Sequence, residues 1–175
     1  MIPLIVSPTS AFQTKLHGSL HSMRVSTMLS SHKFALLTKS TVALSFGLYA
    51  LLAGISNLLD FDSNYHFVRH VLAMDTMKPF FSQVLIDARA IHSTSLHLAA
   101  YYSIIATEIL SGILCLSGAI TMFNSIVSQK KFELAKTLYN AGSCLALALW
   151  YLGFCVIGGE WFAMWANEWN GLTKA

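Results

Sequence analysis

The residue best placed to do chemistry is Glu108, a lone carboxylate inside a long apolar segment. It is the only charged residue between Ser93 and Ser128. An ionised carboxylate deep in a membrane costs about 2.5–3.5 kcal/mol on insertion scales, so this side chain should face other helices, be protonated, or both. In the other two apolar segments, the positions that lie as deep from the outer end as Glu108 are near Tyr49 and Trp150–Tyr151. The sequence therefore predicts a hydrogen bond between Glu108 and a tyrosine.

Two interpretations of Glu108 follow from this position. The first is a buried polar clamp that holds helices together. The second is a site for a proton, an ion or a small molecule such as haem or quinone, formed with Tyr49, Tyr151 and nearby histidines. Replacement of Glu108 by glutamine separates them, because a clamp tolerates the amide and a proton relay does not.

Four histidines lie between the first two apolar segments: His66, His70, His92 and His97. His66 and His70 are spaced i, i+4, which places both on one side of a helix. Such a pair could bind a metal or a haem iron. No Cys-x-x-Cys-His or His-Glu-x-x-His pattern accompanies them, so the sequence predicts no metal site and leaves the cofactor unknown.

The end of the chain carries an unusual aromatic tail. Three tryptophans fall within nine residues, among two glutamates and two asparagines. Tryptophan is common at membrane interfaces and is also a favoured anchor of protein interfaces. We interpret the tail as part of a cap or partner surface whose candidate residues are Asp75, Glu160, Trp161, Trp165, Trp169 and Asn170.

Known catalytic and nucleotide-binding patterns are absent from the sequence. It contains no Walker A motif, no Gly-x-Gly-x-x-Gly and no Gly-x-Ser-x-Gly. We therefore predict no catalytic residue; a meeting of His70, Asp75 and Glu160 in the cap would be the sole support for an enzyme. Cys115, Cys144 and Cys155 all lie in apolar segments, where we interpret them as packing residues.

The composition places these residues in an integral membrane protein. Hydrophobic residues make up 55% of the chain and charged residues 11%, against about 25% charged in soluble domains. Three apolar segments, at 34–59, 98–123 and 138–161, reach the roughly 20 residues that span a bilayer. The sequence predicts an all-α bundle of three transmembrane helices in contact with lipid, and the dispersed net charge of +3 speaks against nucleic acid.

The remaining segments are shorter or more polar. Residues 63–74, capped by Asp62 or Ser63, and residues 79–91, opened by Pro79, are predicted as amphipathic helices in the first outer loop. Residues 1–33 form a Ser/Thr-rich arm without acids. It is expected to be disordered, to be a transit-like leader, or to result from a misassigned start, with Met23 or Met28 as the real first residue. The transmembrane domain is then 34–175.

Small residues recur along the three spans at helical spacing and predict close helix packing. They are Ala43, Gly47, Ala50 and Gly54 on the first, Thr107, Ser111 and Cys115 on the second, and Ala141, Gly142, Ala146 and Gly153 on the third.

Basic residues predict the orientation. The arm before the first span, the start of that span and the turn at 124–136 hold seven Lys and Arg, whereas the 60–95 region and the tail hold four. Basic residues favour the cytoplasmic side, so the N-terminus should be cytoplasmic and the C-terminus outside. The 60–95 region and the tail then share one face, where they could pack into a cap.

Long stretches of this sequence resemble a known family. They are Phe67–Thr76, Tyr102–Gly112 and Gly158–Phe162, with Met164-Trp165 and Trp169-Asn170-Gly171. Residues 34–175 resemble a bacterial family of predicted small integral membrane proteins, domain-of-unknown-function family 2165. That family usually has Trp-Arg where this chain has Ala88-Arg89, and Gln-Ser where it has Ala166-Asn167. The resemblance implies a bacterial inner-membrane protein without an assigned activity.

The functional hypothesis is a non-enzymatic accessory or complex-forming membrane subunit. Its partners would be other membrane subunits or a second copy of the chain. The alternative hypothesis is the small-molecule, haem, quinone or proton site described above.

Overall fold

A computed structural model describes residues 10–125 and 131–173 of the chain. The order of elements is α1 (Ser10–Leu59), α2 (Phe61–Ala73), α3 (Gln83–Arg89), α4 (Thr94–Ser125), α5 (Phe132–Leu147), the π-helix η2 (Ala148–Trp161), and the short 3-10 helices η3 (Met164–Ala166) and η4 (Gly171–Thr173). These described ranges contain no strand, which confirms the all-α prediction.

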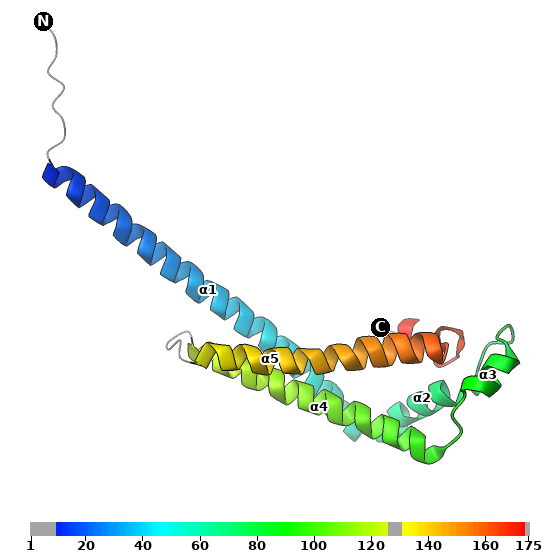
Figure 1. Ribbon diagram of the computed structural model, residues 1–175. Coiled ribbons are helices and arrows are strands. Elements are labelled where there is room, and N and C mark those ends of the chain that lie inside the picture. The colour runs from blue at the N-terminus through cyan, green and yellow to red at the C-terminus, as the bar shows by residue number, and fades with distance from the viewer. Residues whose placement is uncertain (1–9, 126–130, 174–175) are drawn as a thin grey trace, which may run out of the picture.

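Three helices are long and apolar enough to cross a membrane, which confirms the predicted number of spans. Within the described residues they cover Lys15–Leu59, Thr94–Ser125 and Phe132–Trp161. Figure 1 shows successive spans running in opposite directions. Helix α4 is central: it packs along α1 on one side and α5 on the other, whereas α1 and α5 touch each other only sparsely.

Glycines bring the helix backbones into close contact. A Cβ added at Gly112 of α4 would lie 2.7 Å from the backbone nitrogen of Leu51 on α1. At Gly142 of α5 it would lie 2.8 Å from the backbone oxygen of Ser111, whose hydroxyl donates a 2.8 Å hydrogen bond to the oxygen of Gly142. Side chains are excluded at both crossings, so small residues determine how close the three helices come.

The predicted small-residue stripe holds for α1, for Ser111 and Cys115 of α4, and for part of the third span, whereas the hydroxyl of Thr107 bonds the oxygen of Ser103 within α4. Ala43 and Ala50 are fully buried, and a Cβ added at Gly47 would clash with α4. On the third span Ala141 is exposed, because it lies one residue, about 100° of helix, from the contacting Gly142. Gly153 meets nothing closer than 3.6 Å, so it is no packing glycine.

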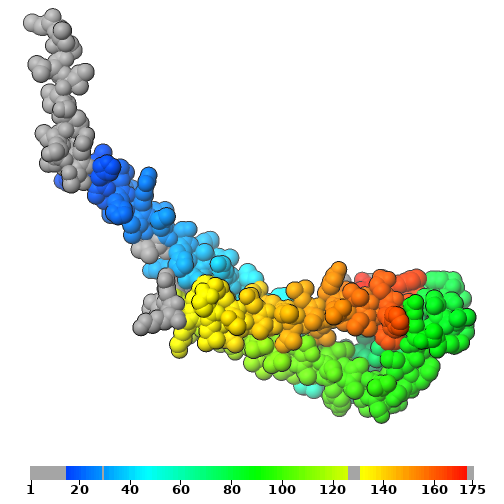
Figure 2. Space-filling model, viewed as in Figure 1, coloured from blue at the N-terminus to red at the C-terminus, as the bar shows by residue number. Residues whose placement is uncertain are grey.

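The N-terminal arm differs from the disordered alternative where the structure describes it. From Ser10 onward it is helical and continuous with the first span. Figures 1 and 2 show this part of α1 extending away from the other helices. Between Lys15 and Met28 its side chains are exposed, including Leu16, Leu20 and Met23. Residues 1–9 lie outside the described residues, and removal of the arm as a leader stays a prediction.

The two helices between the first and second spans are present, but their starts differ from the prediction. Helix α2 has Asp60 at its N-cap, without a side-chain cap hydrogen bond, rather than Asp62 or Ser63. Helix α3 begins at Gln83 rather than Pro79. The backbone before α3 bonds the tail instead of forming a helix. The nitrogen of Lys78 donates to the oxygen of Ala166 at 2.9 Å, which holds this segment against the tail.

Candidate functional site

A cap covers one end of the bundle; it consists of α2, α3 and the tail, residues 61–92 and 158–173. Its buried core is Val71, Met74, Phe162, Ala163 and Met164. The chain turns sharply at two of these residues, where Met74 has φ 49° and Ala163 has φ 48°. Left-handed backbone is unusual for residues other than glycine. Here it ends α2 and η2, and it turns the segments that follow these helices back across the core. The expected packing of tail and loop is therefore present.

Backbone hydrogen bonds join the tail to the segment after α2. Met77 and Asn167 form an antiparallel bridge. The nitrogen of Glu168 donates to the oxygen of Thr76 at 3.0 Å. A further bond, from the nitrogen of Ile91 to the oxygen of Leu72 at 2.9 Å, holds the segment after α3 against α2. Parts of the chain about 90 residues apart are thus fixed in one register.

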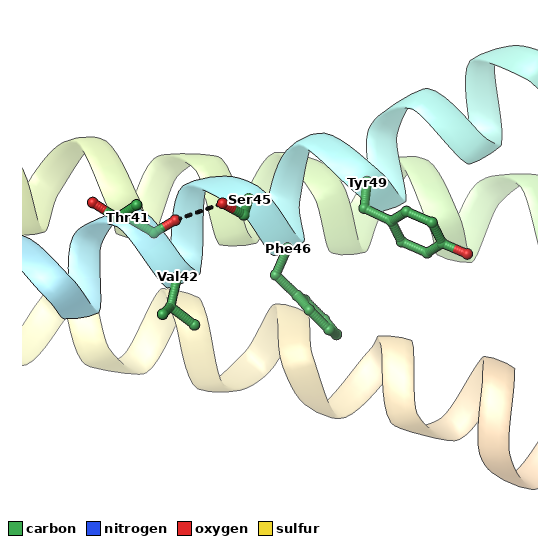
Figure 3. Close-up of a pocket in the computed structure, with 5 residues that line it drawn as sticks. All are labelled: Thr41, Val42, Ser45, Phe46 and Tyr49. Carbon is green, nitrogen blue, oxygen red and sulfur yellow. Dashed lines mark hydrogen bonds between the residues drawn. The ribbon is translucent and has the colours of Figure 1, made fainter.

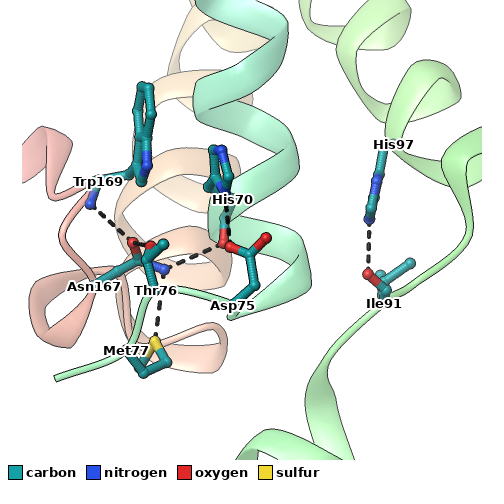
Figure 4. A network of polar contacts seen from close by, with 8 residues as sticks. All are labelled: His70, Asp75, Thr76, Met77, Ile91, His97, Asn167 and Trp169. Atoms are coloured by element: carbon teal, nitrogen blue, oxygen red, sulfur yellow. Dashed lines mark hydrogen bonds and ion pairs between the residues drawn. The ribbon is translucent and has the colours of Figure 1, made fainter. Parts of the chain in front are cut away.

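Asn167 is the polar centre of the cap. Its side chain is buried, and Figure 4 shows it between α2 and the tail. Its Oδ1 accepts hydrogen bonds from the hydroxyl of Thr76 at 2.6 Å and from the nitrogen of Trp169 at 2.8 Å. Its Nδ2 donates to the backbone oxygen of His70 at 3.2 Å. The sequence analysis did not propose Asn167 as a cap residue; its position between Trp165 and Trp169 was the available signal.

His70 is held in a fixed orientation beside this centre. Its Nδ1 lies 2.7 Å from a carboxylate oxygen of Asp75. The ring stacks on the indole of Trp169, with centroids 4.9 Å apart and planes at 12°, and lies 6.1 Å from the ring of His66. An ionised carboxylate only accepts hydrogen bonds, so Nδ1 of His70 is the donor in this contact.

The other candidates for a metal or catalytic centre do not join His70. Glu160 is exposed near the end of η2 and is not a hydrogen-bond partner of His70 or Asp75. His97 instead donates from Nε2 to the oxygen of Ile91 at 2.7 Å. Across the described ranges, no group of three or more His, Cys, Asp or Glu side chains is placed to hold a metal ion.

Exposed aromatic side chains surround the cap, and we call Phe80, Trp161 and Trp165 the aromatic rim. Phe80 is 71% exposed and stacks on Trp165, which is 45% exposed, at 6.5 Å. The guanidinium of Arg89 lies 5.1 Å from the ring of Trp161 and donates to its backbone oxygen at 3.1 Å. Asn170 fixes the tail behind the rim by donating to the oxygen of Trp165 at 3.4 Å.

Glu108 is buried between α1 and α4, but its partner is not the predicted tyrosine. Its Oε2 accepts a 2.6 Å hydrogen bond from Nδ2 of Asn57, whose backbone oxygen accepts from the hydroxyl of Tyr101 at 2.8 Å. Tyr49 and Tyr151 are 63% and 65% exposed. This bond joins α1 to α4, as a polar clamp would, and the proton or small-molecule site at Glu108 stays a prediction.

The register of α1 against α4 explains the difference. Gly54, near the end of α1, lies opposite Glu108 and Ile109, whereas Thr94 at the start of α4 lies beyond that end and α4 also packs on α2. The predicted Glu108–tyrosine bond assumed that the outer ends of both spans lie at the same depth in the membrane. Glu108 therefore lies opposite the end of α1 rather than opposite its middle.

Comparison with known proteins identifies the family. A family model described as predicted small integral membrane protein (DUF2165) matches residues 35–175, which include the cap and all three spans from residue 35 onward. No curated protein and no solved structure matches the chain. The resemblance seen in the sequence is thereby confirmed, and the chain belongs to this family of small integral membrane proteins of unknown function.

Proposed function

We propose that this protein is a non-enzymatic, complex-forming subunit of a bacterial inner membrane, and that its cap is the surface that binds another membrane protein. The observation that carries the proposal is the aromatic rim. Phe80 and Trp165 remain 71% and 45% exposed, although the cap behind them is closed by a buried core and by the bonds of Asn167.

Rigid exposed aromatic residues have the character of binding anchors. Large aromatic side chains supply most of the binding free energy in many protein interfaces, and contiguous exposed apolar patches mark such sites. On α3, four residues after Phe80, Val84 is also 75% exposed. The rim belongs to a cap ordered by its own contacts, so a partner would bind a preformed surface and little ordering free energy would be lost.

Purification from the native membranes tests this proposal. Tagged full-length protein in mild detergent should bring down a stoichiometric membrane protein identified by mass spectrometry. The double variant Phe80→Ala/Trp165→Ala should lower its recovery at least about tenfold while the thermal midpoint stays near that of the wild type. Leu147→Ala removes an equally exposed apolar residue outside the cap and should retain the partner.

Two outcomes would contradict the proposal. One is wild-type protein that elutes alone from native membranes. The other is full retention of the partner by the rim variant. If the purified protein associates only with itself, the partner of the cap is a second copy of the chain.

We also propose that the N-terminus is cytoplasmic and that the cap lies on the periplasmic face. The uneven distribution of Lys and Arg supports this orientation; two of these residues, Lys130 and Lys174, lie outside the described residues. A membrane-impermeant thiol reagent should label Thr173→Cys in cells with a permeabilised outer membrane, in a background with the three native cysteines replaced. Protection until the inner membrane is lysed would reverse the orientation.

A further inference from the structure

Two lysines from different helices lie beside the ring of Phe132, at the end of the bundle opposite the cap. The ammonium nitrogen of Lys39 on α1 lies 5.9 Å from the ring centroid of Phe132, and that of Lys136 on α5 lies 5.3 Å from the same centroid. Lys39 is exposed, and Lys136 donates to Glu133 at 2.8 Å. Phe132 thus marks a place where positive charge from both helices gathers at the seam between α1 and α5.

An apolar groove begins directly beside this charged end. Lys39, Val42, Phe46 and Tyr49 follow one another at spacings of three and four residues, so they share one face of α1. A shallow cavity of about 360 Å³ is lined by Thr41, Val42, Ser45, Phe46 and Tyr49. Figure 3 shows Val42 and Phe46 projecting from α1 toward α5.

The groove offers little to a polar ligand. The hydroxyl of Thr41 donates to the oxygen of Leu37 and that of Ser45 to the oxygen of Thr41, both at 3.0 Å within α1. At its far end Phe46 and Tyr49 pack against Trp150 at ring distances of 6.3 and 5.2 Å. The surface is therefore apolar along the span and cationic at one end.

We propose that this seam binds an anionic phospholipid, with its phosphate between Lys39 and Lys136 and an acyl chain along Val42, Phe46 and Tyr49. Phosphate carries the charge that the two ammonium groups complement, and basic pockets between membrane helices bind anionic headgroups in this way. The apolar groove runs along a membrane-spanning helix, where an acyl chain lies and a water-soluble anion does not. The seam is at the opposite end from the cap, so this site is independent of partner binding there.

Native mass spectrometry of the full chain in mild detergent tests the site. Phosphatidylglycerol and phosphatidylcholine with identical acyl chains should be titrated in parallel, and phosphatidylglycerol should be retained more tightly. A lysine near anionic lipid contributes a factor of about five, and Lys136 contributes less because it shares its charge with Glu133. The double variant Lys39→Ala/Lys136→Ala should therefore lower the preference about tenfold.

Three control variants separate the contribution of the two lysine charges from that of the apolar groove. Lys39→Arg/Lys136→Arg keeps both charges and should keep the preference. Lys78→Ala removes an exposed lysine of the cap and should leave it unchanged. Val42→Trp should fill the groove and weaken retention of both lipids with the lysines intact.

Three results would overturn the proposal. They are equal retention of the two lipids by the wild-type protein, an unchanged preference in the double alanine variant, and full displacement of phosphatidylglycerol by an equal concentration of inorganic phosphate. The last result would mean a site for free anions. The comparison of the two lipids on wild-type protein decides the question even if a variant fails to fold.

Discussion

Replacement of Asn167 by alanine is expected to release the tail from the rest of the cap. The side chain is buried and bonds the hydroxyl of Thr76, the nitrogen of Trp169 and the oxygen of His70. Each buried polar group left without a partner costs about 1–3 kcal/mol. Alanine removes the partner of three part-buried groups. Water can reach these groups in part, so the loss should be about 1–3 kcal/mol in total, concentrated in the cap.

Limited proteolysis and tryptophan fluorescence would detect this release. Cleavage after Trp161 should become faster, and the emission of Trp165 and Trp169 should shift to the red while the three spans stay helical. Asn167→Asp keeps the two bonds accepted by Oδ1 but buries a carboxylate and places its second oxygen against the oxygen of His70, so it should also release the tail. Glu168→Ala changes an exposed neighbour and should behave as wild type, and a cleavage rate for Asn167→Ala equal to wild type would contradict the expectation.

Replacement of Gly112 by alanine should destabilise the contact between α1 and α4. The added Cβ would lie 2.7 Å from the backbone nitrogen of Leu51 and 2.8 Å from its Cα. Backbone cannot rotate away as a flexible side chain can, so the helices must separate. Overpacking of this kind costs about 1–3 kcal/mol, which exceeds the gain of up to about 1 kcal/mol in helix propensity from glycine to alanine.

The matched control is Gly153→Ala on the third span. A Cβ there meets nothing closer than 3.6 Å, so the same change in propensity acts without a clash. Thermal unfolding in detergent should show a lower midpoint for Gly112→Ala and an equal or higher midpoint for Gly153→Ala. Equal shifts for both variants would mean that the close contact of α1 and α4 does not limit stability.

The two proposed sites lie at opposite ends of one central helix. Helix α4 contacts α2 of the cap at one end and packs on α1 and α5 along the bundle. The clamp of Asn57 and Glu108 joins α4 to the last turn of α1, two residues before that helix ends at Leu59. This polar contact thereby fixes the point where the chain leaves the bundle and enters the cap.

The sequence alone was sufficient for the class of protein and its three spans. Length and hydropathy of a span depend on composition within a single segment, so they can be read without knowing any neighbour. The same holds for the small residues of α1, whose spacing places them on one face. The two helices before the second span were also predicted, although their starts at Phe61 and Gln83 were not.

The partners of individual side chains were decided by the tertiary structure. Glu108 bonds Asn57 rather than a tyrosine because α4 begins beyond the end of α1, an offset that no single segment encodes. Asn167 became the centre of the cap because the left-handed turn at Ala163 returns the tail to α2. Contacts between distant segments depend on helix register and chain reversal, which arise only when the helices pack.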